Sequence, residues 1–170
     1  MKSLNLLKSL IDLFLLFSVI GAIGAIILVP VKLLNPEFDI PIKIKDVEVT
    51  GGDWLSLVVV VCSAIGAFFF VYSIFTLRKV LQLFLRNEIF NETVIKYCKV
   101  VGKCIIASAL LNAIPMFFYN MVQRNHLGIE FNAGGFDSLL LSVSLGLLFI
   151  VIGEIFQKAK NLKEENELTV

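Results

Sequence analysis

The sequence has few charged residues and only one histidine. Charged residues make up 17% of its 170 positions, whereas a soluble domain of this length carries about a quarter. This shortage excludes an ordinary soluble domain. His126 lies near Arg124 and has no second histidine that could help it bind a metal, and the sequence has no Gly-rich phosphate loop. A metal cluster or a catalytic triad needs several converging side chains, so we expect no enzyme activity, no metal and no cofactor.

The cysteines and the net charge argue against further classes of protein, namely disulfide-linked, zinc-binding and nucleic-acid-binding proteins. The three cysteines, Cys62, Cys98 and Cys104, are odd in number and fit neither a disulfide framework nor a zinc site. We expect them to be reduced and to pack as small hydrophobic residues. The net charge is +1, which gives no electrostatic basis for direct nucleic-acid binding.

Long apolar runs are what the sequence has in abundance. Hydrophobic residues make up 58% of the chain, with 15 phenylalanines, and the mean hydropathy is +0.89. A membrane-spanning helix needs about 20 mostly apolar residues, and four segments provide them. We therefore predict an all-α membrane protein, a four-transmembrane-helix bundle that forms a single domain over residues 1–170. The predicted spans are 10–31, 54–77, 100–123 and 138–157.

The first of these runs is too long for a cleaved signal peptide and has no small-residue cleavage site, so we expect it to be retained. The fourth run is uncharged only over 138–153 and reaches full length by including Glu154. Beyond it, the charged segment 158–167 is predicted to continue the same helix. At the third run, Asn91 followed by Glu92 and Thr93 predicts a helix start.

The distribution of cations predicts the orientation. Cytoplasmic loops of membrane proteins carry an excess of Lys and Arg. Eleven of the fifteen Lys and Arg residues flank the spans on one side: Lys2, Lys8, Arg78, Lys79, Arg86, Lys96, Lys99, Lys103, Lys158, Lys160 and Lys163. We therefore expect both termini, the connector 78–99 and the tail 158–170 in the cytoplasm, and the loops 32–53 and 124–137 outside.

The outer loops alternate apolar and polar residues. Ile40, Ile42 and Ile44 alternate with polar residues or proline, and Ile129 and Phe131 do so in the second loop. A period of two predicts strands, so we predict a small extracytoplasmic β-structure formed by the first loop and joined by the second. It would serve as a lid over the helix ends or as a ligand-sensing site, and the sequence does not decide between the two.

Three polar residues lie in or near the predicted spans: Asp12, Asn112 and Glu154. Lys8 and Lys158 stand four residues from the two carboxylates, a spacing that places each pair on one helix face. Snorkelling ion pairs are therefore favoured over ion translocation. Asn112 is expected to bond across helices, and Pro115 nearby predicts a bend or a polar cavity.

Small residues recur at a spacing that lets helices approach closely. These pairs are Gly21 with Ala25, Ser63 with Ala67, and Ser142 with Gly146. Such faces serve packing within the molecule or a homo-oligomer, and the sequence leaves both open.

The connector and the tail contain the candidate docking residues for a partner: Arg78, Arg86, Lys96, Lys99, Lys103, Glu164, Glu165, Leu168 and Val170. Two interpretations stay open for the connector cations. They contact anionic lipid head groups, at about 1 kcal/mol each, or they bind an acidic cytoplasmic protein. The tail is either a solvated helix end or a docking segment.

Two stretches carry a family likeness: Phe90-Asn91-Glu92-Thr93 through Gly102, and the tail from Ile155 to the final Glu-Glu-Asn-Glu-Leu-Thr-Val. With four spans in 170 residues, the chain resembles the uncharacterised bacterial membrane family known as domain of unknown function 2975. The resemblance implies a multi-pass protein of the bacterial cytoplasmic membrane. No activity is established for the family, but its genes commonly stand beside one for a small helix-turn-helix regulator of the Cro/C1 type.

The resemblance therefore suggests a function in binding. We expect a non-enzymatic membrane protein that binds or sequesters the small cytoplasmic regulator and responds to a signal from the envelope. The alternatives are an immunity or stress-protection protein and a small transporter or channel. The expected partners are the lipid bilayer and the regulator.

Overall fold

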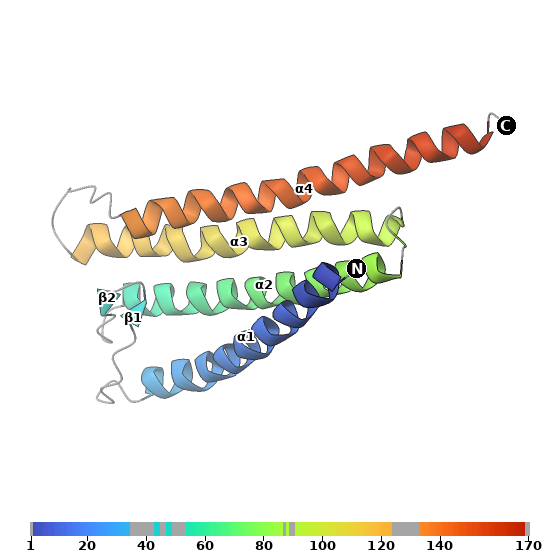
Figure 1. Ribbon diagram of the computed structural model, residues 1–170. Helices are drawn as coiled ribbons and strands as arrows, with labels where there is room; N and C mark the ends of the chain where they lie inside the picture. The colour runs from blue at the N-terminus through green and yellow to red at the C-terminus, as the bar shows by residue number, and fades with distance from the viewer. Residues whose placement is uncertain are drawn as a thin grey trace.

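The computed structural model shows four long helices and one very short hairpin (Figure 1). It describes residues 2–34, 43–44, 47–48, 54–86, 88, 91–123 and 133–168. In chain order, the elements are α1 (Lys2–Leu34), β1 (Lys43–Ile44), β2 (Val47–Glu48), α2 (Trp54–Leu85), α3 (Glu92–Gln123) and α4 (Ala133–Leu168).

Each of the four helices is long and apolar enough to cross a membrane, which confirms the prediction of four spans. α2 and α3 have 32 residues each, and a helix of that length is about 48 Å long. The hydrocarbon core of a bilayer is about 30 Å thick, so the helices continue beyond it. α4, predicted to contain the shortest apolar run, is the longest helix with 36 residues, because the charged tail continues it to Leu168.

The four helices of the predicted bundle form an open row in the order of the sequence. α1 packs on α2, α2 on α3, and α3 on α4. Among the described residues, the backbone of α1 approaches neither α3 nor α4. Figure 1 shows that α1 and α2 diverge toward the end of α1, where the chain leaves it.

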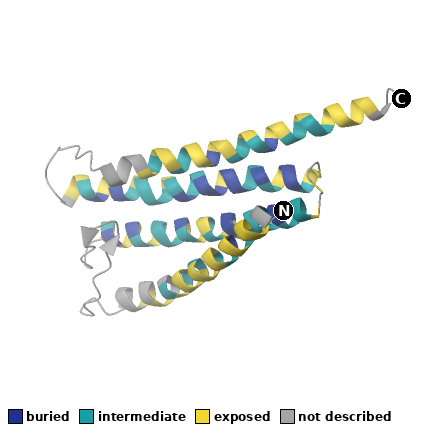
Figure 2. Ribbon diagram, viewed as in Figure 1, coloured by how far each residue is buried: buried dark blue, intermediate teal, exposed yellow. Residues whose placement is uncertain are grey.

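Three apolar clusters hold the row together. One joins α1 to α2 through Ile11, Ile74 and Leu81. The other two lie on α3, at its two ends, and their buried members are Val59, Met116 and Tyr119 in one and Val80, Val94 and Cys98 in the other. Burial is therefore concentrated on α3 and on the faces that α2 and α4 turn toward it, while α1 is mostly exposed (Figure 2). The exposed residues of α1 are large and apolar, as expected of a helix surrounded by lipid.

The cysteines take part in this packing as predicted. Cys98 and Cys104 are buried, Cys62 is half-buried, and all three are free thiols.

The predicted β-structure is not supported. β1 and β2 are two residues each and pair antiparallel, with Lys43 opposite Glu48 and Ile44 opposite Val47. Such a hairpin makes too few hydrogen bonds to be a stable unit in water. Within the described residues it is the only strand pairing. The second loop, with Ile129 and Phe131, lies outside the described residues.

Glycines set the distance between α3 and α4. A Cβ atom at Gly146 would lie 2.8 Å from the carbonyl oxygen of Gly102, and a Cβ atom at Gly102 would collide with the carbonyl oxygen of Gly146. About two turns after Gly146 in α4, a Cβ atom at Gly153 would lie 3.2 Å from the carbonyl oxygen of Ile95. Backbone therefore contacts backbone along this seam, as the small-residue pattern at Gly146 predicts.

The small residues of α1 behave differently. A Cβ atom at Gly21 or Gly24 would meet nothing within 4 Å among the described residues. The glycine face of the first span therefore packs against none of the residues that the structure describes.

The glycine seam generates a first prediction. Gly102→Ala is expected to destabilise the protein by about 1–3 kcal/mol, because the added methyl group overpacks a backbone contact. The midpoint of thermal unfolding of the purified protein in detergent, followed by circular dichroism, measures the loss. Gly24→Ala is the matched control: its site is open, and an alanine in a helix is favoured over glycine by about 1 kcal/mol. Equal midpoints for the two variants would show that the α3–α4 seam is not as tight as described.

Candidate functional site at the charged end

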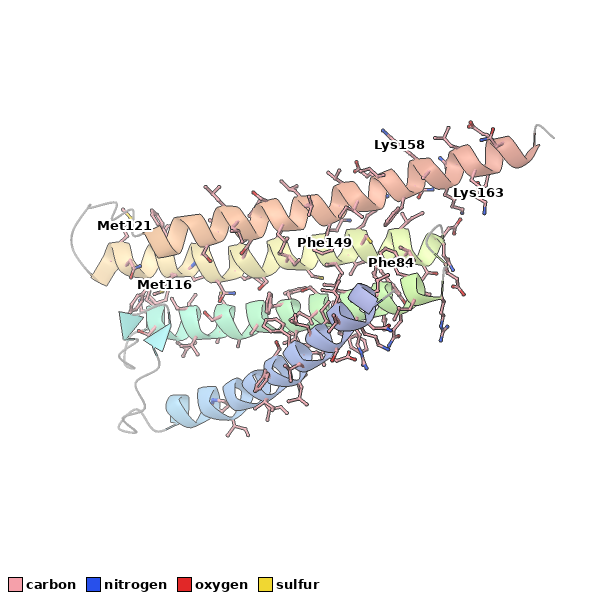
Figure 3. All side chains as sticks on the ribbon, viewed as in Figure 1. Phe84, Met116, Met121, Phe149, Lys158 and Lys163 are labelled. Carbon is pink, nitrogen blue, oxygen red and sulfur yellow. The ribbon has the colours of Figure 1, made fainter. Side chains whose placement is uncertain are left out.

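One end of the helix row contains nearly all the ionisable side chains that the structure describes. We call it the charged end; it comprises the first half of α1, the turn between α2 and α3, and the last half of α4. Figure 3 shows the labelled residues Phe84, Lys158 and Lys163 on this side of the molecule and Met116 and Met121 toward the other.

Contacts place charged residues of the four helices at one level, and Lys103 lies about one turn deeper on α3. Asp12 of α1 pairs with Arg78 of α2, and the neighbouring Lys79 reaches Tyr97 of α3. Two residues further along α3, the side chain of Lys99 lies against Gly153 of α4, next to Glu154. The apolar spans of all four helices therefore end at a common plane, as the surface of a hydrocarbon slab requires.

The pair between Asp12 and Arg78 links α1 to α2. Arg78 Nε lies 2.6 Å from Asp12 Oδ1, and the two side chains are about one third exposed. The two contacting atoms themselves are buried and have no hydrogen-bond partner among the described residues, so the contact is an ion pair without good hydrogen-bond geometry. The predicted partner of Asp12, Lys8 in the same helix, is not the cation found here. The packing of Ile11 on α2 brings Arg78 to the carboxylate instead.

Lys79 belongs to the charged end, but it was not among the predicted docking residues. Its Nζ lies 4.6 Å from the ring centre of Phe75 and 5.8 Å from that of Tyr97. A cation over an aromatic face is stabilised by about 0.5–1 kcal/mol at an exposed site. Phe75 precedes Lys79 by four residues, so the pairing within α2 had a visible signal in the sequence, whereas the contact with α3 had none.

The start of α3 is capped as predicted. Asn91 Oδ1 accepts a hydrogen bond of 3.0 Å from the backbone N–H of Thr93. Its carbonyl oxygen accepts bonds from the N–H groups of Val94 and Ile95. Since a helix start leaves several N–H groups without partners, Asn91 fixes where α3 begins after the turn.

An ion pair joins the tail of α4 to the start of α3. Lys160 Nζ donates a hydrogen bond of 2.6 Å to Glu92 Oε1 and lies 3.4 Å from Glu164 Oε1. Glu92 and Lys160 lie beyond the spans 100–123 and 138–157. Lys160 lowers the pKa of the Glu92 carboxyl, chiefly through the hydrogen bond and also through its charge. Glu92 in turn raises the pKa of Lys160.

An aromatic contact supports the same region. The rings of Phe84 in α2 and Phe156 in α4 meet edge to face, with their centres 5.7 Å apart. Both pack against the cluster of Val80, Val94 and Cys98. At the charged end, therefore, α2, α3 and α4 meet in one packed unit that continues past the common plane.

The predicted docking residues do not form one patch. Arg78 is engaged by Asp12 on the α1 side. The cations of α3 lie on another helix: Lys96 and Lys103 are exposed, and Lys99 is half-buried beside Gly153. Arg86 is exposed after the end of α2. In the tail, Glu164 and Glu165 are exposed, Leu168 is the last residue of α4, and Val170 lies outside the described residues.

The structure also shows the surroundings of the other two predicted intramembrane polar residues, Asn112 and Glu154. The sequence predicted that Asn112 bonds to another helix, but among the described residues it does not. Its Nδ2 donates a hydrogen bond of 2.8 Å to the carbonyl oxygen of Ser108, one turn earlier in α3. Its amide fills the space left by Gly66 of α2. Pro115 lies inside α3, which continues unbroken to Gln123. Glu154 is exposed.

The ionisable residues of the charged end also bear on metal binding. Within the part of the chain that the structure describes, no three His, Cys, Asp or Glu residues stand close enough to hold a metal ion. What the geometry offers is a projecting, charged helical surface, which is suited to binding.

Four apolar helices whose charged residues align at one plane define a multi-pass membrane protein. The chain belongs to the family described as protein of unknown function DUF2975, whose model matches residues 27–170. The resemblance seen in the connector and the tail is thereby confirmed. The chain matches no curated protein and no solved structure.

The pair between α1 and α2 generates a second prediction. Asp12→Asn and Arg78→Gln are each expected to lower the thermal midpoint, and a double-mutant cycle should give a coupling of about 1 kcal/mol, since both side chains are partly exposed. Unfolding of the detergent-solubilised protein measures each value. Arg86→Gln, a loss of the same charge at an exposed position, should leave the midpoint unchanged. Additive effects of the two substitutions would contradict the pairing.

The tail pair generates a third prediction, with a defined pH dependence. Because the pKa of Glu92 is lowered in the folded protein, the pair is intact at neutral pH and is lost as the pH falls through that lowered value. A spin label at Leu162→Cys, in a chain whose native cysteines are replaced by alanine, should become more mobile in acid.

Glu92→Gln should produce that mobility already at neutral pH. Glu88→Gln is the matched control, since Glu88 is an exposed carboxylate of the same turn. If Glu92→Gln left the spectrum unchanged, Lys160 would not be what holds the tail.

Proposed function

We propose that this protein is a non-enzymatic protein of the bacterial cytoplasmic membrane that binds a small helix-turn-helix regulator at its charged end. The observation that carries the proposal is the projecting tail of α4. Every side chain described from Asn161 to Asn166 is exposed, although the helix that presents them is anchored by Lys160 and Phe156. An exposed helix that can dock in a groove of a partner is a common form of recognition element.

The orientation is part of the proposal. Eleven of the fifteen Lys and Arg residues flank the spans at the charged end, and such an excess is retained in the cytoplasm during insertion. The tail would then face the compartment in which a transcription regulator acts. Both chain termini would lie on that side.

The length of the projection supports the proposal. α4 continues for 14 residues from Ile155 to Leu168, which is about 21 Å of helix. The nearby ends of α2 and α3 form its base, so the tail is held away from the membrane surface in a fixed direction. A partner bound there would be held at the membrane.

The chemistry of the tail fits a DNA-binding partner. Leu162 is 61% exposed and is followed by Lys163, Glu164 and Glu165. An exposed leucine among charges is the usual anchor of a helix that docks in a groove. Helix-turn-helix proteins carry cations on the surface that contacts phosphates, and carboxylates of the tail would bind the same cations. Binding here and binding to DNA would then exclude each other.

The family supplies the identity of the expected partner. Genes of this family commonly stand beside one for a regulator of the Cro/C1 type. This association is the reason for proposing such a regulator, and no other cationic protein, as the partner of the tail.

Co-purification tests the proposal. A tagged chain, extracted in mild detergent, is expected to recover the regulator encoded by the neighbouring gene. Deleting residues 162–170 should reduce the recovery at least tenfold, because the deletion removes the anchor but keeps the Lys160–Glu92 pair. Leu162→Ala should cause most of that loss.

Leu141→Ala is the matched control. Leu141 is 70% exposed on the same helix but lies within the apolar span, so its loss should leave recovery unchanged. Undiminished recovery by the chain without residues 162–170 would remove the tail from the model.

A further inference from the structure

One exposed line of side chains runs the length of α3. At helical spacing, its members share one face: Lys96, Lys103, Leu110, Ile114, Phe117 and Met121. All of them are exposed in the structure. We call this line the α3 stripe. It is cationic at the charged end and apolar everywhere else.

Lys103 lies deep for an exposed cation. It is four residues past Lys99, or about 6 Å further along the helix, and its neighbour Gly102 contacts the backbone of Gly146 within the predicted span of α4. An ammonium group at that depth must extend toward the head groups or meet an anion. The ion pairs described at the charged end use Arg78 and Lys160 and do not include Lys103 or Lys96.

Lys99 stands beside the stripe and is fixed in place. Its Cγ would lie 3.0 Å from a Cβ atom at Gly153, so the missing side chain of that glycine makes room for the lysine stem. Three cations at positions i, i+3 and i+7 therefore gather within two turns of α3, at the edge of the seam with α4. Their common neighbourhood is rich in positive charge.

The apolar part of the α3 stripe is suited to contact with an acyl chain. Leu110, Ile114 and Phe117 are 40%, 51% and 60% exposed. From Lys103 to Ile114 the helix rises about 16 Å, which is close to one half of a hydrocarbon core of about 30 Å. The part of the stripe from Lys103 to Ile114 thus spans about one leaflet of the bilayer, with charge toward the head groups and apolar surface beyond it.

We propose that the α3 stripe binds one anionic glycerophospholipid of the surrounding bilayer. Its phosphate lies among Lys96, Lys99 and Lys103, and an acyl chain follows Leu110, Ile114 and Phe117. The charge selects anionic over zwitterionic head groups, and the apolar part selects a lipid over free phosphate. The site is separate from the tail of α4, so it does not depend on the proposed regulator.

Native mass spectrometry of the whole chain tests this site. After delipidation in detergent, the protein is titrated with phosphatidylglycerol, with phosphatidylcholine of the same acyl composition, and with inorganic phosphate. Phosphatidylglycerol is expected to give a retained one-to-one adduct. Phosphatidylcholine should bind at least tenfold more weakly, and inorganic phosphate should give no adduct.

Variants locate the binding. Each lysine near an anionic lipid surface contributes about 1 kcal/mol, so Lys96→Gln and Lys103→Gln should each weaken phosphatidylglycerol about fivefold, and the double variant more than twentyfold. Lys103→Arg keeps the charge and should bind normally, which separates a loss of charge from a loss of fold. Arg86→Gln removes the same charge elsewhere and should bind as the unmodified chain does.

Two results would overturn the proposal. One is equal binding of the two phospholipids. The other is a loss in Arg86→Gln as large as that in Lys103→Gln, which would show a general effect of net charge and no site on α3.

Discussion

The position of the hydrocarbon surface is the constraint on which the rest of the structure depends. Charged groups cannot stay in the hydrocarbon without partners, and an apolar helix of about 20 residues fills its thickness. Asp12, Arg78, Lys99 and Glu154 mark that surface on four different helices, and contacts between neighbouring helices place them together. The lengths of the helices then decide what projects. α4 has the longest continuation past this plane, so the tail, with the ends of α2 and α3, forms the exposed part of the charged end.

Packing within the membrane follows a second rule, since apolar area does not distinguish a neighbouring helix from lipid. Close contact of backbones does, and the glycines at 102, 146 and 153 provide it between α3 and α4. α1 contacts α2 through one cluster, one ion pair and the edge-to-face rings of Phe14 and Phe70, while a Cβ atom at Gly21 or Gly24 would meet no described residue within 4 Å. The open row follows from this difference: small residues become useful only where a facing helix also presents backbone or a small side chain.

Much of the fold could be predicted from the sequence, because the lengths of apolar runs and the residues that flank them are local properties. The four spans, the cap at Asn91 and the continuation of α4 were all predictable. The partner of Asp12 was not, because a pair with Lys8 needs only a helix, whereas the pair with Arg78 needs the packing of α1 on α2. Asn112 shows the same limit: its type predicted a bond between helices, but Gly66 lets the amide stay beside its own helix. Among the candidate site residues, types were predictable and groupings were not.

The grouping matters for function because it separates cations that look alike in the sequence. Arg78 and Lys160 are neutralised by carboxylates of other helices, and Lys79 lies over aromatic rings, so these three stabilise the fold. Lys96 and Lys103 are exposed on the side of α3 whose continuation is apolar, which is a surface for lipid. The described side chains of the tail beyond Lys160 are exposed. The proposed soluble partner would therefore use the tail of α4 and the proposed lipid would use α3, so the two kinds of ligand would not compete for the same side chains.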